Sequence, residues 1–227
     1  MVVIQDAAQA FGASTPDGRR APTHGLIGTA SFFPAKPLGC YGDGGACFTN
    51  DDHLADRLRS IRVHGKGTDK YDNVRIGQNC RLDTIQAAVL IEKLKIYSEE
   101  LEQRDQVAAK YAHAMQSLGG MGLSTPQIPD GFRSAWAQYT IRYPDRNALS
   151  THLKEQDIPS VVYYRTPAHQ LAACQGLQDA QLEFPESENA AKTVLSLPFH
   201  PYLTGDSRDR IVEAIIEFCA ENTLPVT

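Results

Sequence analysis

A helical tract from Leu82 to Leu118 is the feature that most limits how this chain can fold. Its apolar side chains recur every three or four residues, as on one face of a helix, and charged or amide side chains fill the positions between them. Gly119-Gly120-Met121-Gly122 follows, and such a glycine cluster ends a helix. We therefore predict a domain boundary there, with domains at residues 1–118 and 119–227. The apolar positions of the tract are Leu82, Ile85, Val89, Leu94, Tyr97, Leu101, Tyr111 and Met115.

Short strands joined by turn-rich loops are expected before the tract. Val2–Ile4, Thr29–Phe33 and Ala46–Thr49 are apolar, aromatic or small-residue runs bounded by turn residues, which predicts three strands. Asp51–Val63 has helical spacing. Strands combined with helices in this way predict an α/β domain.

Strands and helices alternate again after the tract. We expect strands at Ala135–Tyr143 and Ser160–Tyr164. Helical spacing predicts helices at Arg146–Gln156, Glu186–Leu195 and Ser207–Glu221. This part of the chain is therefore expected to form a smaller α+β domain.

Composition and charge argue against several classes of protein. Lys and Arg number 22 against 27 Asp and Glu, so the net charge of −5 disfavours a broad basic face for nucleic acid. No apolar run approaches the roughly 20 residues that span a bilayer, and the N-terminal sequence lacks a secretory signal pattern, so we expect a cytoplasmic protein. The five cysteines form no C-x-x-C pair and the seven histidines no H-E-x-x-H motif. We therefore expect neither a disulfide framework nor a metal site.

Lys36 is the residue with the clearest chemical interest. It lies between Pro34-Ala35 and Pro37, and both prolines push their preceding residues out of the helical region, so the lysine is expected on a rigid loop. A partly buried lysine loses its proton more easily and can attack a carbonyl carbon. The alternative is an ordinary solvated loop lysine.

Asp6 follows the first expected strand. The carboxyl ends of parallel strands line the ligand crevice of an α/β sheet. A carboxylate there, with a carbonyl-binding lysine at a later strand end, is the minimal set for pyridoxal phosphate, because the acid keeps the pyridine nitrogen protonated while the lysine carries the aldehyde. The alternative is an aspartate that caps a helix or solvates a loop.

Several short motifs, in order, resemble the DegT/DnrJ-type sugar aminotransferase family, whose members use pyridoxal phosphate to aminate nucleotide-linked keto sugars. The resemblance covers essentially the whole chain. It implies the latter part of a fold type I pyridoxal phosphate transferase large domain, with a mostly parallel sheet, followed by a small α+β C-terminal domain. The motifs are Asp6-Ala7-Ala8-Gln9-Ala10, Ser31-Phe32-Phe33-Pro34-Ala35-Lys36, Gly42-Asp43-Gly44-Gly45-Ala46, Asn79-Cys80-Arg81-Leu82, Val162-Tyr163-Tyr164 with Pro167 and His169, and Leu195-Ser196-Leu197-Pro198.

The resemblance also assigns cofactor roles residue by residue. Lys36 matches the catalytic Schiff-base lysine, and Asp6 matches the acid paired with the pyridinium. Gln9 matches the residue packed beside the ring, and Ser31 matches the hydroxyl that binds the cofactor phosphate. Asn79 matches a residue that reaches the phosphate in the neighbouring subunit, which implies a homodimer with shared active sites.

Substrate contacts are implied for a second group of residues. Arg81 and Tyr164 match positions that contact the sugar nucleotide, and Tyr163 and His169 lie beside them. On a strand, Tyr163 and Tyr164 would point to opposite faces, so at least one is expected to serve packing. Arg165 stands where the family usually has proline. Arg165 and Arg81 are the candidates to meet a sugar carboxylate, because a guanidinium suits bidentate contact.

We therefore expect an aminotransferase of a nucleotide-linked keto sugar, with glutamate as amino donor, in surface-polysaccharide or amino-sugar biosynthesis. The C-terminal motifs favour UDP-linked acetamido sugars, uronic acids included. Lys36 favours transamination over the dehydration that relatives with histidine at this position carry out. The alternative is a non-catalytic dimerising module that retained the fold. A general nucleotide-binding domain is a weaker third hypothesis, since the chain has neither G-x-G-x-x-G nor G-x-x-x-x-G-K-[ST].

Members of the family carry an N-terminal portion ahead of the motif aspartate. That portion supplies a turn that holds the cofactor phosphate and an aromatic residue that stacks on the pyridine ring. Here the strand leading to Asp6 begins at Val2. We expect the chain to be the C-terminal part of an aminotransferase, to bind pyridoxal phosphate weakly by itself, to show little or no activity, and to expose an aggregation-prone sheet edge.

Overall fold

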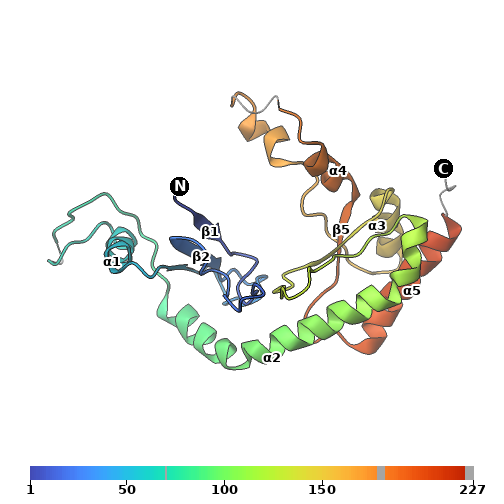
Figure 1. Cartoon of the computed structure of the whole chain (residues 1–227), viewed down its shortest axis with the longest axis horizontal. Coiled ribbons are helices and arrows are strands. Elements are labelled where there is room, and N and C mark those ends of the chain that lie inside the picture. Colours follow the sequence, from blue (N-terminus) through green and yellow to red (C-terminus); the bar gives the residue numbers. More distant parts are fainter. Residues whose placement is uncertain (70, 178–181, 223–227) are drawn as a thin grey trace. The chain divides into compact units, whose positions relative to one another are not determined.

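The computed structural model of the chain describes residues 1–69, 71–177 and 182–222 (Figure 1). These residues belong to two compact units. The first comprises Met1–Glu102 and Ile128–Ala137, and the second comprises Gln103–Gln127 and Gln138–Thr227. The division falls inside the long helix, and the domain boundary after residue 118 stays a prediction.

The first unit is built on a three-stranded sheet of order β1-β2-β3. The strands are β1 (Ile4–Asp6), β2 (Ile27–Ser31) and β3 (Gly45–Phe48), so the α/β class is confirmed. The second and third strands overlap their expected ranges, whereas the first begins two residues later than the expected Val2–Ile4 and ends on Asp6. β1 pairs with β2 in parallel, and β2 pairs with β3 antiparallel. Because β1 and β2 run the same way, their carboxyl ends lie at one edge of the sheet.

Two helices follow the sheet along the chain. Helix α1 (Asp52–Ile61) begins where the Asp51 carboxylate accepts the backbone N–H of Leu54, which satisfies one of the free donors of the first turn. Helix α2 (Thr84–Ala114) confirms the predicted long helix and is followed by a 3₁₀ turn, η1 (Gln116–Met121) (Figure 1).

The core of the first unit lies between α2 and the strand-end loops. Leu101 of α2 is buried in a cluster with Phe32 and Cys40. Gly12 has a φ of +97°, and a Cβ there would lie 2.8 Å from Leu101 Cδ1, so this close approach requires glycine. The predicted apolar face is buried in part, since Ile85 of α2 is 76% exposed.

The second unit combines a two-stranded antiparallel sheet with helices. The strands are β4 (Tyr139–Arg142) and β5 (Val194–Leu197), and the helices are α3 (Arg146–Glu155), α4 (Pro185–Thr193) and α5 (Gly205–Glu221), with short 3₁₀ turns η2 (Ala168–Gln170) and η3 (Ala172–Cys174). Burial of Tyr139, Ile141, Leu195 and Ile215 places the core between this sheet and the helices. The expected α+β character is thus present.

Two strand expectations and one helix expectation need correction in this unit. The strand expected at Ala135–Tyr143 is confined to Tyr139–Arg142. The strand expected at Ser160–Tyr164 is wrong, because the segment makes only an isolated bridge, between Val161 and Ser196. The helix expected to run to Leu195 ends at Thr193, and β5 begins at the next residue. The Arg146 guanidinium donates to the carbonyl oxygens of Ala191 (3.1 Å) and Val194 (3.2 Å), which satisfies backbone acceptors where the helix ends.

No helix in the described ranges is both long enough and apolar enough to cross a bilayer.

Candidate functional site

Lys36 lies on a loop whose two ends are fixed by backbone hydrogen bonds. The Phe32 N–H donates to the Gly44 carbonyl at 2.8 Å, and the Cys40 N–H donates to the Phe32 carbonyl at 2.8 Å. Between these points, the Lys36 N–H closes a tight turn onto the Phe33 carbonyl at 2.9 Å. The Lys36 side chain is half-buried, and its amine makes no hydrogen bond or ion pair with any described residue. The loop therefore holds the backbone of Lys36 in place and leaves its amine available to a ligand.

Two side chains of α2 support this loop from behind. The Tyr41 N–H donates to Gln86 Oε1 at 2.8 Å, and Lys93 Nζ donates to the Gly39 carbonyl at 2.5 Å. Lys93 Nζ also lies 5.5 Å from the centroid of the Tyr41 ring. Neither Gln86 nor Lys93 was predicted. Their seven-residue spacing puts both on one side of the helix, but it does not reveal a contact with a loop some 45 to 54 positions away.

Asp6 and Ser31 end the two parallel strands. Asp6 pairs in register with Thr29, and side chains of paired residues share a face of a sheet, as do residues two apart on one strand. Asp6, Thr29 and Ser31 therefore lie on one face at one edge. Asp6 Oδ1 accepts the Ala8 N–H at 2.9 Å, and Ser31 Oγ accepts the Phe33 N–H at 3.3 Å. Thr29 is a further hydroxyl that the sequence analysis did not single out.

The remaining predicted residues of the first unit lie outside this group. Gln9 is exposed in the turn that follows β1. Asn79 forms an isolated bridge with Val63, and the adjoining Cys80 N–H donates to the Arg62 carbonyl at 2.9 Å. Arg81 is exposed. Within the described residues, no hydrogen bond or ion pair joins any of these three side chains to Lys36.

A groove of about 1110 Å³ also lies in the first unit. Phe48 of β3, Leu58 and Arg62 of α1, and Arg81 are among the residues that line it. Thr29 lines it too, whereas Lys36, Asp6 and Ser31 do not. We therefore locate the candidate site by its strand-end chemistry and not by this groove.

Tyr163, Tyr164 and His169 belong to the second unit. Tyr163 and Tyr164 are 41% and 68% exposed, and their rings meet edge to face with centroids 5.6 Å apart. The expectation that the two rings occupy opposite faces of a strand is wrong, because the segment is a turn. His169 Nε2 lies 3.1 Å from Glu188 Oε1. Glu188 was not predicted, because its position in the expected helix did not indicate a contact with His169.

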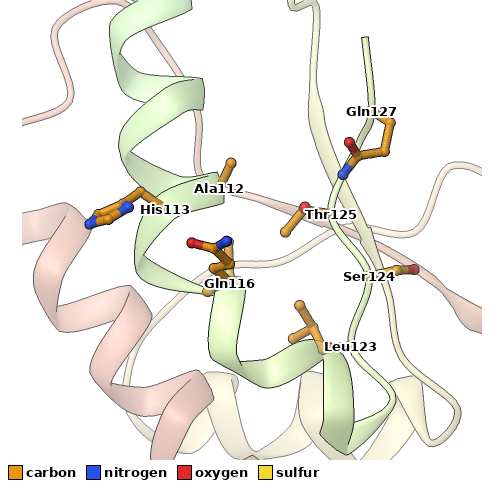
Figure 2. A pocket seen from close by; sticks show the side chains of 9 residues that line it. Ala112, His113, Gln116, Leu123, Ser124, Thr125 and Gln127 are labelled. Carbon is orange, nitrogen blue, oxygen red and sulfur yellow. The ribbon is translucent and has the colours of Figure 1, made fainter. Parts of the chain in front are cut away.

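A hollow of about 500 Å³ lies beside the end of α2 (Figure 2). Ala112 and Gln116 face Leu123 and Thr125 across it. The polar groups around it do not converge, since His113 and Ser124 point to opposite sides in Figure 2. A small-molecule site needs convergent polar groups, so we assign this hollow no role.

The residues at the strand-end site fit pyridoxal phosphate by their chemistry. The cofactor needs an amine for its aldehyde, a carboxylate for its pyridine nitrogen and donors for its phosphate. The site offers the Lys36 amine, the Asp6 carboxylate and the hydroxyls of Ser31 and Thr29. Metal chemistry has no comparable support, because the described residues hold no cluster of three or more potential metal-ligating side chains.

Comparison with family models gives one matching description, the DegT/DnrJ/EryC1/StrS aminotransferase family, over residues 1–216. Among curated relatives, "UDP-2-acetamido-2-deoxy-3-oxo-D-glucuronate aminotransferase" of Pseudomonas aeruginosa is 46% identical over 201 residues, 88% of this chain and 54% of that protein. "Pleiotropic regulatory protein" of Geobacillus stearothermophilus is 45% identical over 220 residues, 96% of this chain and 58% of that protein. The chain thus spans little more than half the length of these relatives.

Solved structures give the same result. A DegT DnrJ EryC1 StrS aminotransferase from Brucella abortus matches with a TM-score of 0.90 and 48% identity, over 96% of this chain and 57% of that one. NtdA from Bacillus subtilis, with bound cofactor PMP, matches with a TM-score of 0.87 and 28% identity, over 97% of this chain and 51% of that one. The fold is therefore that of the fold type I aminotransferases, as expected.

Proposed function

The chain belongs to the DegT/DnrJ/EryC1/StrS aminotransferase family, and we propose that it carries the reactive lysine of a pyridoxal phosphate-dependent aminotransferase of nucleotide-linked keto sugars. The observation that carries this proposal is the grouping of Asp6 and Ser31 at the carboxyl ends of two parallel strands, with Lys36 on the clamped loop that follows Ser31.

The residues that match the family's cofactor positions have separate tasks. When bound, pyridoxal phosphate supplies an aldehyde that condenses with amines and a ring that withdraws electrons. Lys36 would hold the aldehyde, and its free amine would move a proton to or from the substrate carbon. The Asp6 carboxylate would keep a proton on the pyridine nitrogen, Ser31 would donate to the phosphate, and Gln9 would pack beside the ring.

We further propose that the acceptor is a UDP-linked acetamido sugar in its uronic acid form, made for a surface polysaccharide or amino sugar, with glutamate as the donor. The support is the 46% identity with the Pseudomonas aeruginosa relative, whose name specifies such a sugar. Arg81 or Arg165 is the candidate guanidinium for the sugar carboxylate. Tyr163, Tyr164 and His169 are the remaining substrate contacts.

The active enzyme is proposed to be a homodimer, in which Asn79 completes the phosphate site of the neighbouring subunit. Exposed apolar side chains on α2 support an interface there, since Ile85, Ile91 and Leu94 are 76%, 58% and 49% exposed. Apolar side chains left exposed along a helix in this way are available to a partner surface.

The test is amination by the full-length enzyme loaded with pyridoxamine phosphate, because this chain alone is expected to show little or no activity. We expect conversion of UDP-2-acetamido-2-deoxy-3-oxo-D-glucuronate at least about tenfold faster than of the same sugar with a hydroxymethyl group in place of the carboxylate. Arg81→Gln or Arg165→Gln should reduce this preference, whereas Arg57→Gln on α1 should not. Equal rates with the two sugars would contradict the proposed preference for a uronic acid. Failure to aminate any keto sugar would contradict the proposed aminotransferase activity.

A non-catalytic dimerising module is the second candidate, and the regulatory name of the Geobacillus stearothermophilus relative favours it. The two hypotheses differ in cofactor chemistry. A lysine-bound pyridoxal phosphate absorbs in the visible or near-ultraviolet and becomes fixed to the protein by borohydride. A module without the cofactor would show neither property.

A further inference from the structure

His169 and Glu188 form a pair that joins the loop after Tyr164 to α4. The Nε2 atom of His169 lies 3.1 Å from Glu188 Oε1, and the two side chains are 12% and 27% exposed. The contact spans nineteen positions of the chain, so it is a tertiary contact and not a local turn. Because it is mostly buried and made to a carboxylate, it can hold the imidazole ring in one orientation.

Glu188 is itself held in place by the start of α4. Its Oε1 also accepts the Phe184 N–H at 3.2 Å, and the Glu188 N–H donates back to the Phe184 carbonyl at 2.9 Å. The Phe184 N–H lowers the pKa of the Glu188 carboxyl most, and the His169 hydrogen bond and the Lys192 charge add to this against desolvation. Glu188 is therefore ionised at neutral pH, where a carboxylate only accepts hydrogen bonds.

An acceptor at Nε2 fixes the proton of the imidazole. Because Glu188 only accepts, His169 Nε2 must carry a hydrogen, and in the neutral ring Nδ1 is then the acceptor. Nδ1 makes no hydrogen bond to any described residue. The Phe184 ring packs against the imidazole with centroids 4.8 Å apart, which restricts rotation about the contact. The ring is thus oriented with one nitrogen unused by the chain.

We propose that Glu188 is a positioning residue that acts through His169, holding the Nε2–H tautomer so that Nδ1 accepts a hydrogen bond from a hydroxyl or amide N–H of the sugar nucleotide. The contact with substrate rests on the proposed function, whereas the tautomer does not. The groups that face the pair are the Phe184 N–H and ring from the loop and Lys192 from α4.

The tautomer is measured directly from the imidazole ¹⁵N shifts of the chain at about pH 8. We expect His169 to show the Nε2–H form. Glu188→Ala should give a mixture of tautomers, and Glu188→Gln should restore the Nε2–H form, because the amide oxygen still accepts. Glu186→Ala, which removes the other charge of the first turn of α4, is the matched control and should leave His169 unchanged.

The substrate contact is measured from steady-state kinetics of the enzyme. Glu188→Ala should raise the KM for the sugar nucleotide by about tenfold, with kcat and the amino-donor half-reaction nearly unchanged, and Glu188→Gln should recover most of the loss. A Glu188→Ala enzyme with unchanged KM, or a His169 tautomer that ignores Glu188, would overturn the proposal. If no keto sugar is aminated at all, the proposed function fails. The tautomer measurement still shows whether Glu188 controls the imidazole of His169.

Discussion

Single residues of the candidate site owe their roles to backbone position. The Lys36 amine has no polar protein partner in the described residues, and its placement comes from the hydrogen bonds of Phe32, Phe33 and Cys40 that clamp the loop. Asp6 is likewise placed by the end of β1 and by its bond to the Ala8 N–H. Substitution of these side chains should therefore change chemistry more than folding.

Asp6→Asn tests whether Asp6 acts on the pyridine nitrogen of the cofactor. The amide keeps the size of the side chain but no longer stabilises a protonated ring nitrogen, so we expect both half-reactions of the enzyme to slow by about a hundredfold. Stopped-flow absorbance measures each half-reaction separately. Asp52→Asn, an exposed acid on α1, is the control. Wild-type rates in Asp6→Asn would rule out the assigned role.

Asp17 gives a pH-dependent effect far from the chemistry. The Thr15 hydroxyl, which donates to Asp17 Oδ1 at 2.5 Å, lowers the carboxyl pKa from 3.8 to about 2, with help from Arg19. Because the folded pKa lies below the unfolded one, this stabilisation is present above about pH 4 and is lost as the pH falls toward 2. The Tm difference between wild type and Asp17→Asn should shrink over that window. A difference that is constant with pH would contradict it.

At the scale of elements, the sequence predicted the helices and strands whose formation depends on nearby residues. The strands, α1 and the long helix follow from turn residues and periodicity, and so does the lysine loop between two prolines. Periodicity gave no reason for Ser160–Tyr164 to leave the strand conformation, or for Val194 to enter it. The conformations of both segments depend on pairing with distant residues. The backbone of Ser196 forms a bridge with Val161, and the strand that contains Ser196, β5, pairs with β4.

The candidate site divides in the same way. Lys36, Asp6 and Ser31 stand in motifs of contiguous residues, so the sequence could identify them. Gln86 and Glu188 act through contacts 45 and 19 positions away, which no local motif encodes.

Helix α2 allows a matched pair of packing variants. Leu101 is 2% exposed in the core of the first unit, and Leu94 on the same helix is 49% exposed. Leu101→Ala should lower the free energy of unfolding by about 2–5 kcal/mol, because it removes buried methyl groups and leaves a cavity. Leu94→Ala should cost less than about 1 kcal/mol. Denaturant titration compares them, and equal losses would show that α2 is not packed as described.

At the scale of the whole molecule, the sheet of the first unit has two outer strands. β1 and β3 each pair with β2 alone among the described strands, and Val3 and Ile4 are 46% and 64% exposed. Unpaired strand edges with apolar side chains favour edge-to-edge association. Relatives nearly twice as long as the matched region have further chain that could cover such edges.

Self-association of this chain should therefore depend on the β1 edge. Ile4→Lys places a charge there and should shift sedimentation profiles toward the monomer. Ile76→Lys, at a loop residue that is 97% exposed, introduces the same charge away from the sheet. If both variants shift the profile alike, net charge and not the edge is responsible.

The central claim, that Lys36 is the residue to which pyridoxal phosphate attaches, has a direct measurement. The chain is incubated with excess cofactor, reduced with borohydride and digested, and the labelled lysines are identified and quantified by mass spectrometry. The chain alone is expected to bind the cofactor weakly, so the measurement compares lysines with one another. We predict that Lys36 is the first lysine to carry the label as the cofactor concentration rises, that Lys36→Ala abolishes this preferential labelling, and that Lys95→Ala leaves it intact. Label spread evenly over the lysines of the chain, and undiminished in Lys36→Ala, would contradict the account.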